Sequence, residues 1–174
     1  RTGRPAAMKV ARYPAEAVLF DLDGTLLDTI ADLAEGANRM LAEIGRPLRT
    51  LEEIHSFVGK GIPNLVRRCL TENAHASEDE IDVAVGVFRR HYAVVNGHST
   101  RIYPGVPETL AALRAQGRRL AVVTNKAGDF TLPLLERMGL LKVAADTQTS
   151  TLNMAAASLF LERYDLAAHI ATLR

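Results

Sequence analysis

The stretch that decides the fold is LFDLDGTL, residues 19–26, in which two aspartates stand one residue apart directly after an apolar segment. Residues 15–20 read AEAVLF, and this nearly continuous apolar run predicts a strand buried on both faces, as in a parallel sheet. Asp21 then falls at the tip of the strand, and Asp23 lies on the same side of the extended chain. Two carboxylates so close repel each other, so the pattern needs a structural or chemical reason.

Three explanations fit the two carboxylates. Asp-x-Asp-Gly can be a simple turn in which Gly24 supplies a positive φ. It also begins like a calcium loop, but the later ligands and the terminal Glu of that loop are missing. In a catalytic interpretation, Asp21 attacks phosphorus and Asp23 transfers protons. A Mg²⁺ ion would offset the repulsion between carboxylate and phosphate, and Thr25 is expected to hydrogen-bond Asp23.

The remaining pattern predicts an α/β protein with a helical insertion. Residues 118–124, RRLAVVT, form a second buried strand that ends in small polar residues. Between the two strands, residues 31–100 are helical by pattern, with capping boxes at Thr50/Glu53 and Ser77/Glu80. The carboxyl ends of parallel strands meet at one edge of a sheet, which is where open α/β folds carry their sites.

We therefore expect a Rossmann-like parallel sheet core and one inserted all-helical cap subdomain. The core comprises residues 1–30 and 101–174, and the cap comprises residues 31–100. Residues 1–7 precede Met8 and are expected to be an extension without function.

Composition narrows the class of protein. The chain has 174 residues, 48% of them hydrophobic, and a net charge of +1, which favours a packed globular protein and gives no sign of nucleic-acid binding. No apolar run approaches the length of a membrane span, and the N-terminus lacks a signal-peptide core, so we expect a cytoplasmic protein without a membrane partner. The single cysteine, Cys69, lies in an apolar helical pattern and is expected to be a buried structural thiol.

Two motifs carry a family resemblance. FDLDGTLLDT, residues 20–29, resembles the first motif of the haloacid dehalogenase superfamily of phosphohydrolases, and VVTNK, residues 122–126, resembles its second. The resemblance implies that Thr124 hydrogen-bonds a phosphate oxygen, that the backbone at Asn125 assists, and that an aspartyl phosphate forms with Mg²⁺ as cofactor. It also implies that Mg²⁺ is held by the Asp21 side chain, the Asp23 backbone carbonyl and the acids of the fourth motif.

Two further stretches, VGKGIPNLV (residues 58–66) and YPGVPETLAALRAQG (residues 103–117), resemble the phosphoglycolate phosphatase branch of that superfamily. This implies a small phosphate ester as substrate, most specifically 2-phosphoglycolate. It also places Gly59, Lys60 and Gly61 in the loop of the cap that contacts the substrate.

The chain departs from the family pattern after about residue 142. The third motif, a lysine usually followed by proline, and the fourth, Gly-Asp with a later Asp, are not found. Lys142, Asp146 and Asp165 do not match them. The fold is thus expected to be incomplete at the C-terminus, with weak or no turnover. The edge of the first strand would be exposed and covered by the alanine-rich tail or by a homodimer.

Alternative functions remain open at this point. The chain can be a catalytically silent phosphate-binding or scaffold protein of the same fold, or a sugar-phosphate phosphatase or phosphoglucomutase-like relative. A response-regulator receiver also phosphorylates an aspartate, but the large helical insertion speaks against it. The histidines have no metal-ligand spacing, Asp28 and Asp32 are expected to assist a helix start, and Arg67 and Arg68 are expected on a solvated helix face.

Overall fold

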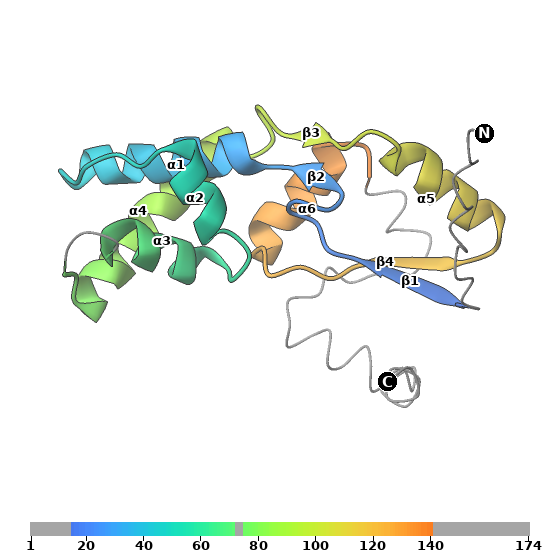
Figure 1. Cartoon of the computed structure of the whole chain (residues 1–174), viewed down its shortest axis with the longest axis horizontal. Helices are drawn as coiled ribbons and strands as arrows, with labels where there is room; N and C mark the ends of the chain where they lie inside the picture. Colours follow the sequence, from blue (N-terminus) through green and yellow to red (C-terminus); the bar gives the residue numbers. More distant parts are fainter. Residues whose placement is uncertain (1–14, 72–74, 141–174) are drawn as a thin grey trace, which may run out of the picture.

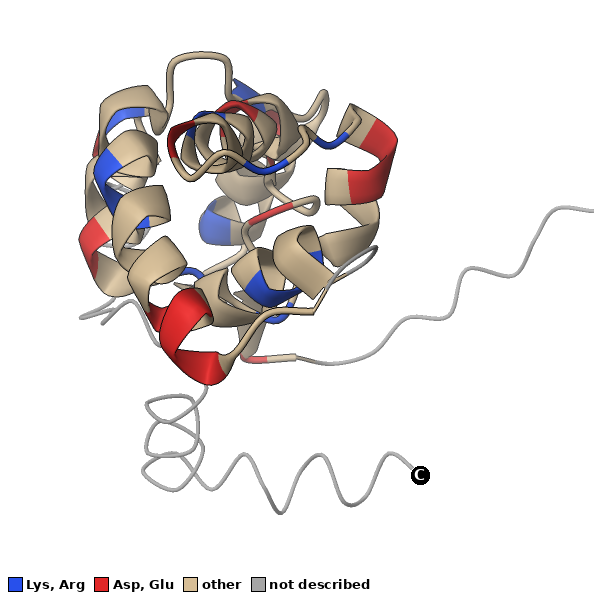
Figure 2. Cartoon of the chain, turned by 90° about the vertical axis from the view of Figure 1, so that its left-hand side faces the viewer, with Lys and Arg blue, Asp and Glu red and all other residues tan. Residues whose placement is uncertain are grey.

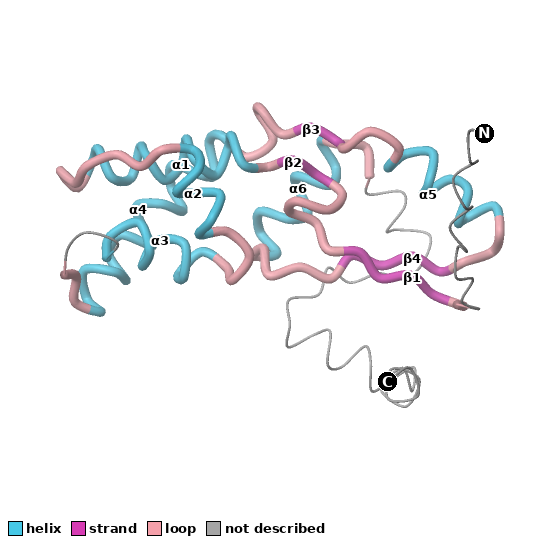
Figure 3. Tube along the Cα trace, viewed as in Figure 1, coloured by secondary structure: helices cyan, strands magenta, loops and turns pink. Residues whose placement is uncertain are grey.

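The computed structural model describes residues 15–71 and 75–140. Helices α1–α4 gather at one end of the molecule, β1, β4 and α5 lie towards the other, and α6 runs between them (Figure 1, Figure 3). In chain order the elements are β1 (Ala17–Phe20), β2 (Leu27–Asp28), α1 (Ile30–Glu43), α2 (Leu51–Phe57), α3 (Ile62–Thr71), α4 (Glu78–Val95), β3 (Arg101–Ile102), α5 (Val106–Ala115), β4 (Arg119–Val122) and α6 (Gly128–Arg137).

The central sheet pairs β1 with β4 in parallel, with Ala17 opposite Arg119 and Phe20 opposite Val122. The pairing extends past the strands, because the Val123 backbone N–H donates to the Phe20 carbonyl at 2.8 Å. The predicted parallel arrangement is therefore confirmed for these two strands. Since parallel strands end at the same edge, the segments that follow β1 and β4 emerge side by side.

A second pair of strands is antiparallel. It joins the two chain crossings, which are the segment that leads from the sheet into α1 and the segment that returns from α4 to the sheet. Leu27 of β2 lies opposite Ile102 of β3, and Asp28 lies opposite Arg101. The sequence analysis did not predict these strands, because an element of two residues has no periodicity to detect.

Burial differs between the two central strands. Leu120 and Ala121 of β4 are buried, whereas every residue of β1 is only half-buried. The prediction of a strand buried on both faces is thus wrong for β1 within the described residues, because β4 is its one partner there and its other edge is unpaired.

The helical end has its own hydrophobic cluster, to which α1–α4 all contribute. Both predicted capping boxes are present: Thr50 and Glu53 cap α2, and Ser77 and Glu80 cap α4. α1 ends as predicted near Gly45, whose φ of +68° allows the Arg46 N–H to reach back to the Leu41 carbonyl at 2.8 Å.

Helix α6 contacts both ends of the molecule. Phe130, in its first turns, belongs to the cap cluster, while Leu134 and Leu135 pack in the cluster beneath the sheet. Asn96 donates from Nδ2 to the Phe130 carbonyl at 2.9 Å, and Arg89 of α4 forms an ion pair with Asp129 at the start of α6. α6 therefore fixes the helical cap against the core.

Charged residues of both signs are interspersed over the helices (Figure 2), in keeping with the small net charge. Arg67 pairs with Glu78 on the surface, and Arg68 lies over the Phe57 ring. Within residues 15–71 and 75–140, no helix combines the length and apolar character needed to cross a membrane. The expectations for Lys142, Asp146, Asp165 and the tail concern positions outside the described residues.

Candidate functional site

The segments that follow β1 and β4 line one pocket at the carboxyl edge of the sheet. Asp21 and Asp23 come from the first segment, and Thr124, Asn125 and Lys126 from the second. The opposite wall belongs to the cap: Leu33, Val58, Gly59, Gly61, Ile62, Leu65 and Tyr92. The structure thus brings together the acidic motif and the threonine motif, which lie a hundred residues apart in the sequence.

A tight turn aims the two aspartates. The Leu22 carbonyl accepts hydrogen bonds from the backbone N–H groups of Thr25 (3.2 Å), Leu26 (3.0 Å) and Leu27 (3.0 Å). Gly24 takes a φ of +80°, a value that other residues adopt only with strain. Leu22 is fully buried, so its side chain anchors the turn while the carboxylates on either side face the pocket.

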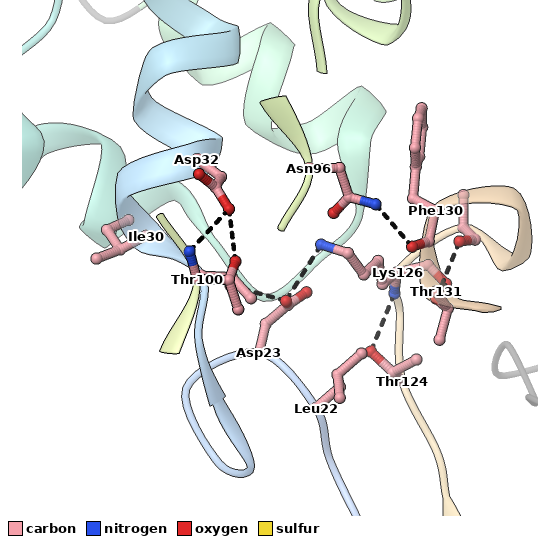
Figure 4. Close-up of polar contacts among 12 residues, drawn as sticks. Leu22, Asp23, Ile30, Asp32, Asn96, Thr100, Thr124, Lys126, Phe130 and Thr131 are labelled. Atoms are coloured by element: carbon pink, nitrogen blue, oxygen red, sulfur yellow. Dashed lines mark hydrogen bonds and ion pairs between the residues drawn. The ribbon is translucent and has the colours of Figure 1, made fainter. Parts of the chain in front are cut away.

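Two side chains hold the Asp23 carboxylate. Thr29 donates from Oγ1 to Asp23 Oδ1 at 2.7 Å. Lys126 Nζ lies 3.2 Å from the same oxygen (Figure 4). The expectation that Thr25 orients Asp23 is corrected by this geometry. Thr25 lies at the exposed outer tip of the turn, and Thr29, four residues later, supplies the hydroxyl.

Lys126 is a site residue to which the sequence analysis assigned no role. Its side chain is 3% exposed, and besides Asp23 it contacts the Tyr92 hydroxyl, to which Nζ donates at 2.6 Å. Burial lowers the pKa of Lys126, and the adjacent Asp23 carboxylate opposes that shift. Burial also raises the pKa of Tyr92, with the charge of Asp23 acting in the same direction, so its hydroxyl stays protonated. The only sequence signal was a lysine two residues after Thr124.

Thr124 and Asn125 face different partners. Thr124 is buried, and its Oγ1 accepts the Lys126 backbone N–H at 3.1 Å, which fixes the hydroxyl beside the pocket. The Asn125 side chain donates from Nδ2 to the Gly59 carbonyl at 2.8 Å, so it contacts the cap. Its backbone remains the part that the resemblance assigns to phosphate.

The cap loop at residues 59–61 reaches the pocket through its glycines. Gly59 and Gly61 both have positive φ, +115° and +79°, and both line the pocket. Lys60 is exposed and does not line the pocket, so the structure does not bring its ammonium to the acidic motif.

Asp32 has a different role from the one expected. It lies in the first turn of α1, but its buried carboxylate accepts hydrogen bonds from the backbone N–H groups of Gly97, Ser99 and Thr100 and from the Thr100 hydroxyl. Figure 4 shows the contact between Asp32 and Thr100 beside the contact between Lys126 and Asp23. Asp32 therefore ties α1 to the returning chain crossing. Asp28 accepts a long 3.4 Å hydrogen bond from the Ile30 N–H, consistent with the expected role at the helix start.

The residues present fit part of a magnesium site. Among the described residues, no group of three or more His, Cys, Asp or Glu side chains could hold a metal ion. Mg²⁺, however, commonly binds one or two carboxylates and completes its shell with water and phosphate oxygens. Asp21 is exposed at the pocket and fits that requirement. The Asp23 carboxylate is engaged by Lys126, so its backbone carbonyl is the ligand that the resemblance implies.

A comparison with known protein families identifies the family of this chain. The sequence model described as haloacid dehalogenase-like hydrolase matches residues 18–150, which is most of the chain. The chain belongs to the haloacid dehalogenase-like hydrolase family. The family match and the likeness in fold to a solved structure, with a TM-score of 0.76, confirm the predicted α/β fold class.

The relatives share more than the acidic motif. The chain is 48% identical over 133 residues to a plasmid-encoded phosphoglycolate phosphatase of Cupriavidus necator, covering 76% of this chain and 58% of that protein. It is 52% identical over 130 residues to a phosphoglycolate phosphatase of Nitrosospira multiformis, covering 74% and 57%. A crystal structure of a predicted phosphoglycolate phosphatase from Haemophilus somnus superposes with a TM-score of 0.76 at 28% identity, covering 87% of this chain and 72% of that one. The chain thus spans less than two thirds of the length of the first two relatives.

Proposed function

We propose that this chain is a magnesium-dependent phosphoric monoester hydrolase that acts on a small phosphorylated metabolite, most specifically 2-phosphoglycolate, in the cytoplasm. The observation that carries the proposal is the convergence of Asp21, Asp23 and Thr124 on one pocket beneath the cap. The substrate is inferred from the named activity of the two bacterial relatives.

In the proposed reaction, a carboxylate oxygen of Asp21 attacks phosphorus, a new O–P bond forms and the ester P–O bond breaks. Asp23 donates a proton to the leaving oxygen of glycolate. Water then attacks the aspartyl phosphate, Asp23 takes a proton from it, and phosphate leaves with Asp21 restored. Thr124 and the Asn125 backbone hold the phosphate oxygens, and Mg²⁺ at Asp21 and Asp23 would neutralise charge on the phosphoryl group.

The cap contributes one wall of the pocket. Val58, Ile62 and Leu65 present apolar side chains there, and Gly59 and Gly61 present backbone. Apolar walls exclude water, which strengthens the electrostatic contacts to the phosphoryl group.

A silent phosphate-binding protein is the second candidate, and one observation favours it. No three-ligand acidic cluster exists among residues 15–71 and 75–140, and the Asp23 carboxylate is paired with Lys126. Such a protein would bind phosphate through Thr124 without turnover.

Phosphate release from 2-phosphoglycolate separates the candidates. The chain is assayed with Mg²⁺ and with EDTA, beside Asp21→Asn and the control Asp28→Asn, whose carboxylate lies outside the pocket lining. We expect a Mg²⁺-dependent rate that Asp28→Asn keeps and that Asp21→Asn lowers by about 1000-fold or more. Equal rates for the folded native chain and Asp21→Asn would refute the enzyme and favour the silent protein.

A further inference from the structure

The loop after β4 contacts the cap from two consecutive residues. Asn125 donates to the Gly59 carbonyl at 2.8 Å, and Lys126 donates to the Tyr92 hydroxyl at 2.6 Å. Gly59 precedes α3 and Tyr92 lies in α4, so the two contacts reach separate parts of the cap. The segment that follows Thr124 is therefore in direct contact with the cap at two points.

Lys126 extends this contact to the acidic motif. Its ammonium lies 3.2 Å from Asp23 Oδ1 and 2.6 Å from the Tyr92 hydroxyl, between a core carboxylate and a cap hydroxyl. Figure 4 shows the Lys126 side chain pointing towards the Asp23 carboxylate. The side chains of Lys126 and Asp23 are 3% and 15% exposed, so water competes weakly for their interaction.

The Tyr92 hydroxyl is a fixed point on the cap. The Tyr92 ring stacks on Phe88, with centroids 5.3 Å apart, and meets the Phe130 ring edge-on at 5.0 Å. Its side chain is buried, so this packing fixes the position of the hydroxyl between α4 and the start of α6. Any displacement of α4 therefore removes one of the two partners of the Lys126 ammonium.

We propose that Lys126 and Tyr92 are positioning residues for Asp23, which make the aim of its carboxylate depend on docking of the cap. With the cap docked, Asp23 is held from two sides, by Thr29 of the first chain crossing and by Lys126. When α4 withdraws, Lys126 loses its anchor and Thr29 alone holds the carboxylate. The catalytic meaning of this arrangement rests on the proposed function of Asp23, but the chain of contacts does not.

Kinetics test the order of action along this chain of contacts. Tyr92→Phe removes one hydroxyl and keeps the ring; we expect kcat for 2-phosphoglycolate with Mg²⁺ to fall about tenfold while KM stays within about twofold. Lys126→Met is expected to lower kcat about 100-fold. The double variant should be no slower than Lys126→Met, because Tyr92 acts through Lys126. Multiplying effects, or a change in KM alone, would overturn the proposal.

A matched control removes a hydroxyl elsewhere in the cap. Thr71→Val deletes an exposed hydroxyl that donates to the Arg67 carbonyl at 2.9 Å and lies outside the pocket lining, so it should leave kcat and KM unchanged.

Amide hydrogen exchange supplies a readout that needs no turnover. The N–H groups of residues 24–27 are hydrogen-bonded within the turn that carries Asp23. We expect them to exchange severalfold faster in Lys126→Met and in Tyr92→Phe, and at the native rate in Thr71→Val. If the native chain and Asp21→Asn share one rate of phosphate release while these changes occur, the proposed function fails and the positioning role holds. Unchanged exchange in both pocket variants overturns the positioning role whatever the activity.

Discussion

The cap and the core of this molecule are assembled from different ranges of sequence. Helices α1–α4 follow one another and share a cluster of 19 buried residues, all but one of which lie between residues 33 and 95. The core cluster has nine among the described residues, and its strands β1 and β4 are separated by the whole cap. Contacts near in sequence have a lower loop-closure cost, so the cap can form from local interactions while the site awaits a distant pairing. The residues of the acidic and threonine motifs belong to the second region.

The largest expected effect tests whether the two regions unfold separately. Phe88→Ala removes a fully buried ring from the cap cluster and should lower the free energy of unfolding of the cap by about 3–5 kcal/mol. Native-state hydrogen exchange should show lost protection in α1–α4, with the amides of β4 less affected.

The matched variant in the core is Leu135→Ala, at a side chain 1% exposed in α6. It should cost about 2–5 kcal/mol and reduce protection in β4 and α6 rather than in α2 and α3. An equal loss of protection everywhere in both variants would break the comparison, since the two regions would then be one cooperative unit.

The next effect concerns the link between the regions. Asp32→Asn keeps the shape of a buried side chain but loses the charge that accepts bonds from three backbone N–H groups and a hydroxyl. We expect a loss of about 2–3 kcal/mol in urea unfolding, because hydrogen bonds to a buried charge are stronger than neutral ones. Asp28→Asn, at a half-exposed position, should cost less than about 1 kcal/mol. A similar loss of unfolding free energy in the two variants would show that Asp32 does not hold the chain segment that returns from α4 to the sheet.

A smaller effect tests whether hydrogen bonds between residues near in sequence stabilise the helical cap. Thr50→Ala removes the hydroxyl that accepts the Glu53 N–H at 3.2 Å and should destabilise α2 by about 1 kcal/mol. Ser56→Ala, in the same helix, removes an exposed hydroxyl and should stay within about 0.5 kcal/mol of the native value. The urea midpoints of the two variants compare them directly. Equal midpoints would argue that the Thr50 N-cap hydrogen bond does not stabilise α2.

The last prediction concerns the pH dependence of stability, which reports whether water reaches Cys69 in the interior of the helical cap. Its effect is absent at neutral pH. Burial raises the pKa of Cys69 from 9.0 to about 11. The folded state therefore holds the thiol proton more tightly than the unfolded state. This contribution to stability is complete below pH 9 and is lost as the pH rises to about 11. The stability difference between the native chain and Cys69→Ala should be constant up to pH 8 and shift by about 1 kcal/mol by pH 10. No shift would indicate a hydrated thiol.

Much of the fold could be predicted from the sequence, because it depends on local patterns. The apolar runs before Asp21 and Thr124 predicted the parallel pair, and Thr50 and Ser77 predicted two helix starts to the residue. The half-exposed β1 could not be predicted from its apolar run, which does not reveal whether a strand has one partner or two. The expectation of an unpaired edge came instead from the missing fourth motif, and among the described residues β4 is the one partner of β1.

The polar network of the site could not be predicted, because it depends on residues brought together only by folding. Thr29 directly precedes α1, but its hydroxyl donates to Asp23 and makes no capping hydrogen bond. Tyr92 has the spacing of a core residue of α4, and nothing in its neighbourhood indicates that its hydroxyl contacts Lys126. The assignment of catalytic, phosphate-binding and metal-binding roles to Asp21, Asp23, Thr124 and Asn125 stays a prediction, as do the domain boundaries.

The pairing of β2 with β3 has a consequence for how such a protein can change. Because Asp28 lies directly opposite Arg101, the insertion leaves and re-enters the sheet domain at adjacent points, roughly 5 Å apart, a span that a two-residue hairpin can close. A gene can thus lengthen, shorten or exchange everything between these two positions without moving β1 or β4. Thr29 and Tyr92 both lie in that insertion, so a replacement has to supply equivalent contacts to Asp23 and Lys126 for the pocket to keep its geometry.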